Sequence, residues 1–338
     1  MLREKFGQQP KLVSGYREYR RTSYILLHRA AREEGLLEYL ETPRTPEEIA
    51  DRFGYDRERI ETLEAILGAL ETVQAVRRET AGDGTERFVV TGGESDDVSR
   101  PIDVELLKEA VGAEKAEAIV YAKNLPDAFT YLRGEKAENT FGGGDRLSQW
   151  TSLLEFPYWD FGRKVAASIV ASPGATVIDF ASGLGHGVRA LAEVVGPDGR
   201  AMGVEMNEEF VRLSSENLPA NAQIRQGDLN DGIDFLEDES FDGAMMIGAF
   251  HFIRDKAWFV GELRRIVRPG SKVVLGNVVR RTNAFDQAAH DITGSMLRPR
   301  VLKETPEEIR TAIEKGGLTI VEEFDDLGCV GWYELQKS

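Results

Sequence analysis

Apolar residues in the first ninety positions recur at intervals that are typical of amphipathic helices. From Ile25 to Leu40 the apolar side chains lie mostly three and four residues apart, which predicts helices with one buried face. Thr45–Glu48 then reads as a helix start, with a hydroxyl N-cap, a proline at the first position and acids in the first turn. A leucine-rich helix should follow over 60–70, and two strand-like pieces flank Gly82–Gly84. Helix, turn, helix and hairpin together are typical of a winged helix.

From Ala175 onward, short apolar strands alternate with helix-length amphipathic segments. This alternation predicts an α/β fold with a parallel sheet and helices on both faces. The expected strands are Thr176–Phe180, Ala201–Glu205, Ala222–Gln226, Gly243–Ile247, Lys272–Gly276, Leu318–Phe324 and Cys329–Leu335. The short link Asp325–Gly328 allows the last two strands to pair only as an antiparallel hairpin.

The segment between these two regions is expected to be mostly helical and is rich in aromatic residues. These side chains could pack the core or line a ligand pocket, and the sequence leaves both open. They are Phe129, Tyr131, Trp150, Phe156, Tyr158, Trp159 and Phe161. We therefore expect a winged-helix-like domain over 1–100, a helical linker and pocket-forming segment over 101–160, and a ligand-binding domain over 161–338.

Charge and composition narrow the classes of partner. The chain has 338 residues, a net charge of -16 and a pI near 4.9, so a large nucleic-acid or anionic-membrane surface is not expected. The single cysteine, Cys329, excludes an internal disulfide and a cysteine-based zinc cluster. No stretch approaches the 18 apolar residues of a membrane span. We expect a cytoplasmic protein without a metal site.

A glycine-rich turn between the first two predicted strands of the sheet indicates a nucleotide-sized ligand. The first strand ends at Asp179, glycines follow at 183, 185 and 187, and the second strand ends at Glu205. Such a turn brings backbone amides close to a ligand at a helix start, and the second acid can accept both hydroxyls of a ribose. A dinucleotide site would need glycine at 188, which is Val188, and the P-loop pattern of ATP and GTP sites is missing.

The pattern acid, x, small, x, Gly, x, Gly over 179–185 resembles motif I of the class I S-adenosylmethionine (SAM) methyltransferases. Gln226–Leu229 is similar to the family's adenine site, and Ser240–Ile247 resembles its motif IV. Leu263–Gly276 resembles the helix, turn and fifth strand that follow, with Pro269-Gly270 as the turn. The resemblance covers about 160–338 and implies a Rossmann-like seven-stranded sheet, closed by the antiparallel hairpin, that binds S-adenosyl-L-methionine.

The resemblance also implies which residues hold the cofactor. Glu205 would bind the ribose hydroxyls, Asp228 the adenine amine, and Met206 would pack on the adenine face. Ala181 stands where the family has its first glycine, so a methyl group should narrow the methionine pocket slightly. Tyr158, Trp159 and Arg163 precede the first strand and are placed to close over the methionine end. The full predicted set is Asp179, Ala181, Ser182, Gly183, Gly185, Glu205, Met206, Asp228, Leu229, Gly248, Tyr158, Trp159 and Arg163.

The N-terminal segment resembles the dimerisation domain of small-molecule O-methyltransferases. Gly35–Leu40, Arg44–Ala50 and the leucine-rich helix carry this similarity, and Leu132–Glu135 with Phe141-Gly142 is similar to that group's linker helices. The resemblance implies a homodimer through the N-terminal helices. DNA binding is not expected, because the recognition-helix candidate over 56–73 carries five acids against two arginines.

His251 is the leading candidate for a catalytic base. It lies nine residues after Asp242, where plant-type O-methyltransferases place their catalytic histidine, although the next residues there are Asp and Trp rather than Phe252 and Ile253. A pocket-lining role and a core role stay open, since no acidic partner can be assigned. Phe250, His251, His290 and Arg298 are expected to line the acceptor pocket, and His186 could contact the cofactor carboxylate.

These observations predict a SAM-dependent methyltransferase that acts on a small molecule. O-methylation of an aromatic or polyketide-like hydroxyl is the leading hypothesis. The alternatives are C-methylation of a quinone-like ring and a non-catalytic SAM-fold scaffold or sensor.

Overall fold

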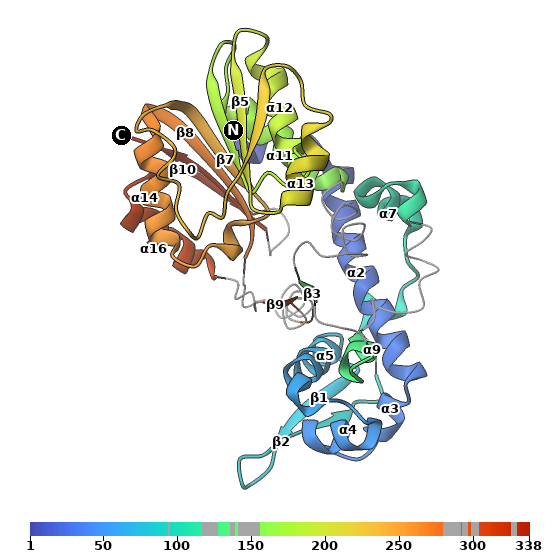
Figure 1. Ribbon diagram of the computed structural model, residues 1–338. Helices are drawn as coiled ribbons and strands as arrows, with labels where there is room; N and C mark the ends of the chain where they lie inside the picture. The colour runs from blue at the N-terminus through green and yellow to red at the C-terminus, as the bar shows by residue number, and fades with distance from the viewer. Residues whose placement is uncertain are drawn as a thin grey trace. The chain divides into compact units, whose positions relative to one another are not determined.

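The computed structural model describes residues 1–93, 95–116, 128–135, 139–140, 156–279, 292, 297–298, 304–325 and 330–338. The chain forms two compact units (Figure 1). The sheet unit comprises the described parts of Met1–Val13, Phe141–Arg280 and Leu302–Ser338. The N-terminal unit comprises those of Ser14–Thr140 and Arg281–Val301. Each unit thus draws on separate stretches of the chain, whereas the sequence-based boundaries were continuous.

A seven-stranded mixed sheet forms the centre of the sheet unit, in the order β10-β11-β8-β7-β4-β5-β6. The five strands from β6 to β8 are parallel, and β11 is antiparallel to both of its neighbours. The strands are β4 Thr176–Phe180, β5 Arg200–Glu205, β6 Ala222–Gln226, β7 Phe241–Ile247, β8 Val267–Val278, β10 Thr319–Asp325 and β11 Val330–Gln336. The predicted fold and its antiparallel closing hairpin are confirmed.

Helices cover both faces of this sheet (Figure 1). The helices are α11 Pro157–Val170, α12 His186–Val195, α13 Glu208–Ser215, α14 Lys256–Ile266 and α16 Pro306–Gly316. From α14 and α16, Phe259 and Ile313 pack into a core with Phe180 and Leu275 of the strands. On the opposite face, a Cβ atom at Gly243 would lie 2.0 Å from the carbonyl oxygen of Val170, at the end of α11. The helix approaches the strand this closely because the strand residue has no side chain.

The strand β8 includes the predicted turn. Pro269 and Gly270 lie inside Val267–Val278, where the register against β7 shifts between Phe241 and Gly243. Gly270 adopts a φ of 82° and its N–H donates to the carbonyl oxygen of Lys337 at 2.8 Å. The proline-glycine pair therefore forms a bulge within a strand rather than a separate turn, because β11 pairs with it on the other side.

The first helix, α1 (Leu2–Gly7), belongs to the sheet unit. Its Phe6 packs against Trp332 of β11 at a ring-centroid distance of 4.9 Å, and against Tyr158 at 6.0 Å. Trp332 fits between α11 and β8 because a Cβ at Gly162 or at Gly276 would lie 2.3 or 2.4 Å from its ring. The sequence-based assignment of residue 1 onward to the winged-helix region missed this aromatic contact.

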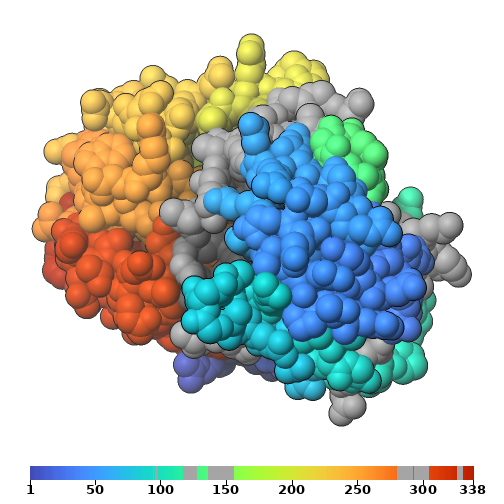
Figure 2. Space-filling view, turned by 90° about the horizontal axis from the view of Figure 1, so that it is seen from below, coloured from blue at the N-terminus to red at the C-terminus, as the bar shows by residue number. Residues whose placement is uncertain are grey.

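The N-terminal unit has the helix, turn, helix and hairpin order that the pattern predicts. Its elements are α2 Pro10–Glu33, α3 Leu36–Tyr39, α4 Pro46–Phe53, η1 Arg57–Arg59, α5 Ile60–Thr72, β1 Val76–Thr80, β2 Glu86–Val90, α6 Asp96–Ser99, α7 Val104–Val111, α9 Ala128–Leu132, β3 Asn139–Thr140 and β9 Leu297–Arg298. Thr45 caps α4 in a reciprocal capping box with Glu48. In Figure 2 the blue and cyan residues of this unit form one continuous surface.

Buried leucines and isoleucines hold this unit together. Leu63, Ile66 and Leu70 of α5 pack against Ile49 of α4 in one core. Arg44 forms an isolated antiparallel bridge to Phe88, which ties the segment before α4 to the hairpin. These contacts account for the mostly helical N-terminal region.

Candidate active site

The carboxyl ends of the parallel strands bring the predicted residues to one edge of the sheet. Asp179 of β4 pairs with Gly203 of β5 on one side and with Met245 of β7 on the other. The strand order reverses at β4, since its two neighbours lead away in opposite directions. Ligands of open α/β sheets bind outside the carboxyl ends at such a switch point.

The loop between β4 and α12 is built from left-handed backbone conformations. Ala181, Gly183 and Gly185 have φ values of 52°, 53° and 76°, and Gly185 is the N-cap of α12. Glycine adopts this region freely, whereas alanine pays about 1 kcal/mol or more. Ala181 is thus held in a strained conformation where the resembling family has glycine. The loop nevertheless keeps the path that exposes amide groups at a helix start.

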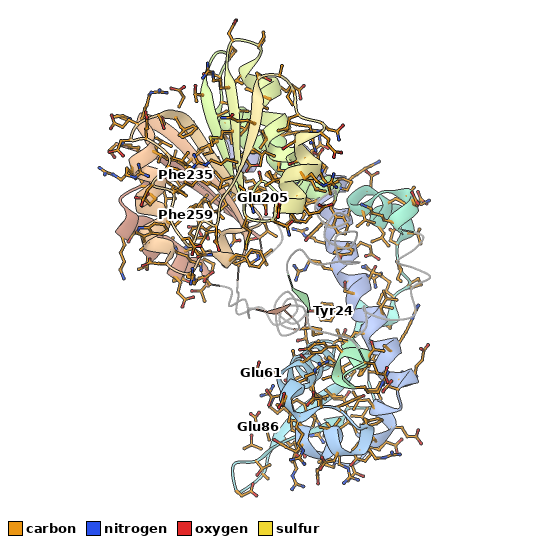
Figure 3. All side chains as sticks on the ribbon, in the orientation of Figure 1. Tyr24, Glu61, Glu86, Glu205, Phe235 and Phe259 are labelled. Carbon is orange, nitrogen blue, oxygen red and sulfur yellow. The ribbon has the colours of Figure 1, made fainter. Side chains whose placement is uncertain are left out.

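Glu205 ties this loop to the end of β5. One carboxylate oxygen accepts the N–H of Gly183 at 2.8 Å, and the other accepts the N–H of Asn207 at 2.9 Å. Burial raises the pKa of Glu205, and the backbone N–H donors act against that shift. Each carboxylate oxygen has a further lone pair, so the group can also accept two ribose hydroxyls. Figure 3 labels Glu205 at the edge of the sheet.

A buried acid and a buried guanidinium lie behind the loop. Burial raises the pKa of Asp179 to about 7, and the positive charge of Arg163 opposes that shift. Arg163 comes from α11 and is only 7% exposed. A Cβ atom at Gly187 would lie 2.2 Å from Asp179 Oδ2, so α12 can start here only with glycine. Arg163 was predicted to contact the methionine end, and its charge acts on the acid at the base of that loop.

The side chains after β5 and β6 provide an apolar face beside polar groups. Met206 follows Glu205 and is 53% exposed, which is unusual for a large apolar side chain. Asp228 accepts the N–H of Asn230 at 2.9 Å, which fixes its carboxylate, and Leu229 is buried. An exposed apolar side chain next to Glu205, with the carboxylate of Asp228 after the neighbouring strand, suits a purine with a ribose.

The residues present fit SAM. Ser182 Oγ is buried and, within the part of the chain that the structure describes, has no hydrogen-bond partner. It sits against Gly203, where a Cβ atom would come within 2.7 Å of it. A buried polar atom without a partner is uncommon and points to a missing donor or acceptor. Glu205, Met206 and Asp228 would hold the nucleoside, and Ser182 with the loop amides would hold the methionine end.

His251 lies just past β7 in η3 (Phe250–Phe252) and contacts Asn277 of β8. The distance between His251 Nδ1 and Asn277 Oδ1 is 2.8 Å, and the backbone N–H of His251 donates to the same oxygen at 3.3 Å. A backbone N–H can only donate, so the amide oxygen faces His251. The ring nitrogen beside that oxygen therefore carries the proton, which leaves Nε2 as the basic nitrogen of the neutral ring.

Asn277 was not predicted as a functional residue. It is fully buried, and it lies 26 positions from His251 in the sequence. The only sequence signal is one polar residue at the end of the apolar run Val273–Val279.

Four predicted residues make contacts within the sheet unit. Phe250 has no exposed surface and packs in the core, 6.5 Å from the ring of Phe259. Tyr158 is also fully buried, and its hydroxyl accepts from Trp332 Nε1 at 3.2 Å. Trp159 packs edge-on against Tyr158. Phe250 and Tyr158 fill apolar space because their element faces turn inward, whereas Trp159 is half-buried and its predicted contact with the methionine end stays a prediction. His186 interacts with Arg189 at 3.1 Å through Nδ1, so it pairs along the helix surface.

The remaining predicted residues are Gly248, Arg298 and His290. Gly248 has a φ of 80° and its N–H donates to the carbonyl oxygen of Gly276 at 2.6 Å. Arg298 lies in β9, whose backbone pairs with β3 in the N-terminal unit. His290 lies outside the described residues. Among the described residues, no group of three His, Cys, Asp or Glu side chains is arranged to hold a metal, and no helix there is long and apolar enough to cross a membrane.

Comparison with known proteins shows that the sheet unit is similar to methyltransferases. The family model of a methyltransferase domain matches residues 171–319. A demethylmenaquinone methyltransferase of Desulfitobacterium hafniense (strain Y51) is 28% identical over 183 residues, which are 52% of this chain and 70% of that protein. The chain spans 55% and 39% of the lengths of two other curated relatives.

Two solved structures share the fold over nearly the whole chain. The citrinin polyketide synthase CMeT domain matches with a TM-score of 0.66 at 12% identity, over 94% of this chain and 89% of that one. An O-methyltransferase family 2 protein from Planctomyces limnophilus DSM 3776, in complex with apigenin, matches with a TM-score of 0.51 at 15% identity, over 97% of both chains. Residues 171–319 match the family model of a methyltransferase domain, and the strand order is the one that the resemblance to class I SAM-dependent methyltransferases predicts, with S-adenosyl-L-methionine as the methyl donor that such a domain implies.

Proposed function

We propose that this protein transfers a methyl group to the oxygen of a small aromatic or polyketide-like hydroxyl compound, with His251 as the base. The observation that carries the proposal is the contact of His251 Nδ1 with Asn277 Oδ1 at 2.8 Å, together with the backbone N–H that orients the amide. This arrangement favours the tautomer whose Nε2 can accept a proton. Asn277 supplies the orienting partner that a catalytic histidine needs.

The bound cofactor supplies an electrophilic methyl group on a sulfonium, so the protein has to align the acceptor and remove its proton. A phenol with a pKa near 10 and a histidine near 6.5 differ by about 3.5 units. Proton removal therefore has to accompany attack. The acceptor oxygen bonds to the methyl carbon as the carbon–sulfur bond breaks, while its proton passes to His251 Nε2 and then to solvent.

A second candidate is C-methylation of a quinol-like ring. It is favoured by the sequence relatives, of which the Desulfitobacterium hafniense protein is named demethylmenaquinone methyltransferase. The anion of a phenol or enol shares its charge between oxygen and a ring carbon, so the same base supports both outcomes. After carbon attack the methylated ring carbon loses its own proton, which restores the aromatic ring.

Product analysis separates the two reactions. The protein is incubated with SAM that carries ¹³C in its methyl group and with a panel of phenols, hydroquinones and β-ketoesters. We expect a labelled methyl ether, whose carbon resonance lies far from that of a ring-bound methyl group. A carbon-bound label would favour the second candidate. Bound cofactor without transfer to any member of the panel would contradict both and favour a SAM-binding scaffold.

We also propose that the protein is a homodimer through its N-terminal helices. The support is the sequence resemblance of residues 35–70 to the dimerisation domain of small-molecule O-methyltransferases, together with the helical arrangement of α2 to α5. Light scattering of the full chain should give twice the monomer mass of 37.6 kDa. A monomeric mass at micromolar concentration would contradict dimerisation and leave the catalytic proposal unaffected.

A further inference from the structure

The oxygen and the nitrogen of the Asn277 side-chain amide have different surroundings. Its oxygen faces two donors on His251, whereas its Nδ2 is buried and has no hydrogen-bond partner among the residues that the structure describes. Buried amide donors without a partner are rare in native proteins, because burial removes water and nothing replaces it. Rotating the amide by half a turn would place Nδ2 against the backbone N–H of His251, and two donors would then face each other. The backbone N–H of His251 thus favours the orientation in which Oδ1 faces the histidine.

The surroundings of Asn277 are those of an active-site edge. The residue lies near the carboxyl end of β8, next to Gly276, whose carbonyl accepts the N–H of Gly248 after β7. Across the strand pair, Asn277 faces Gly331 of β11, which has no side chain. A Cβ atom at Gly331 would lie 2.9 Å from the hydroxyl of Tyr333. The glycine therefore leaves room for the side chain of Tyr333 on this face of the sheet.

We propose that Asn277 Nδ2 donates a hydrogen bond to a second oxygen of the methyl acceptor, over which the negative charge that develops on the reacting hydroxyl is delocalised. The inference rests on the proposed function, in which His251 takes the acceptor's proton. One amide then serves both partners of the reaction: Oδ1 fixes the basic tautomer of His251, and Nδ2 stabilises the anion that the base creates. A donor aimed at developing charge in a dry site is a common source of transition-state stabilisation.

The acceptor class follows from this pairing. The base and the donor act on different oxygens, so the acceptor carries a hydroxyl whose anion is delocalised onto a second oxygen, as in a nitrophenol or an enolised β-dicarbonyl compound. An amine acceptor would present no oxyanion to Nδ2. This expectation holds for attack by oxygen and for attack by the neighbouring carbon.

Two substitutions separate the two halves of the amide. Asn277→Asp keeps an oxygen for His251 and removes the Nδ2 donor. Asn277→Leu has a similar volume and removes both. Asn217→Asp is the matched control, because it makes the same chemical change at an exposed position on the unit's surface. The probe is 4-nitrophenol, whose anion absorbs visible light, added to protein saturated with S-adenosylhomocysteine.

We expect the parent protein and Asn217→Asp to bind the probe as its anion, with the pKa of the bound phenol lowered. Asn277→Asp should bind the anion at least 30-fold more weakly and still show His251 protonated on Nδ1 by ¹⁵N NMR. Asn277→Leu should lose both the probe and that tautomer preference. S-adenosylhomocysteine affinity, measured by calorimetry, should change by less than threefold in every variant.

Two results would overturn the donor role. One is equal affinity of the parent protein and Asn277→Asp for the probe anion, which would leave Asn277 as a positioning residue only. The other is no saturable binding of the probe to the parent protein, which would exclude phenolates as the acceptor class. A result against the proposed base would look different from both. In that case His251→Ala would keep the rate of methyl transfer within tenfold of the parent rate, and the parent protein would still bind the probe.

Discussion

The cofactor side and the proposed acceptor side of this sheet edge, called the donor side and the acceptor side below, are held in different ways. The donor side, the loops after β4 and β5, is fixed by backbone groups: the N–H donors of Gly183 and Asn207 bind Glu205. The acceptor side, η3 and the end of β8, depends on one pair of side chains, His251 and Asn277. A site that is held by backbone groups requires glycines and an acid at fixed spacing in the sequence. A site that is held by contacts between distant side chains has no such sequence pattern. Substitutions on the donor side should therefore alter loop and cofactor binding, and those on the acceptor side turnover.

The largest predicted effect on the donor side is the pH dependence of the free energy of unfolding that Asp179 causes. Its pKa is about 7 in the folded protein, against 3.8 as its ordinary value. The folded state thus keeps Asp179 protonated to a higher pH than the unfolded state does. The stabilisation that the folded state gains from this protonated carboxyl is full below about pH 4 and is lost as the pH rises to about 7. The free energy of unfolding of the parent minus that of Asp179→Asn should fall over this window by up to about 1.4 kcal/mol per pH unit.

Chemical denaturation of both proteins between pH 4 and 8 measures this difference. A difference that stays constant, or that increases with pH, would contradict the burial of an acid behind the glycine loop.

Glu205→Gln should weaken cofactor binding by about 100-fold, which corresponds to about 2.7 kcal/mol. Glutamine has one acceptor oxygen, whereas both oxygens of Glu205 already accept backbone N–H groups. The NH₂ group of the glutamine side chain would face one of these N–H donors and could not accept from it, which would loosen the loop. Calorimetry with S-adenosylhomocysteine gives the affinity, and Glu208→Gln, three residues on and exposed, is the control. An unchanged affinity in Glu205→Gln would separate this acid from the cofactor site.

Two glycine-to-alanine changes compare a crowded position with an open one. A methyl group at Gly187 would lie 2.2 Å from Asp179 Oδ2, whereas nothing lies within 4 Å of the corresponding position at Gly261 in α14. Gly187→Ala should lower the free energy of unfolding by about 1–3 kcal/mol through overpacking. Gly261→Ala should raise it by about 0.5–1 kcal/mol through helix propensity. Equal effects of the two changes in urea denaturation would contradict the close packing of α12 on β4.

The sequence predicts the sheet well because alternating strands and helices have local signatures. β4 and β6 coincide with their predicted ranges, and the other strands differ by a few residues at their ends. The exception is the start of β8, where Pro269-Gly270 is a bulge. It is held by pairing with the distant strand β11, which no local pattern reveals.

Side-chain contacts between distant segments account for what the sequence did not predict. Asn277 meets His251 only because β7 and β8 are neighbours in the sheet. Phe6 docks on Trp332 across almost the whole length of the chain. The place of Phe250 after β7 predicts a pocket residue, but its ring packs in the core 6.5 Å from that of Phe259 of α14, which Figure 3 labels. Periodicity identifies an element and its buried face, and it does not identify the partner.

The most direct test of the account is the rate of a single methyl transfer by His251→Ala at saturating SAM, with the acceptor that the product analysis identifies. General base catalysis contributes typically 10²–10⁴-fold, so we expect the rate to fall at least about 100-fold while the affinity for S-adenosylhomocysteine stays within threefold of the parent value. A decrease of less than about tenfold would contradict the assignment of His251 as the base and leave it as a lining residue of the site.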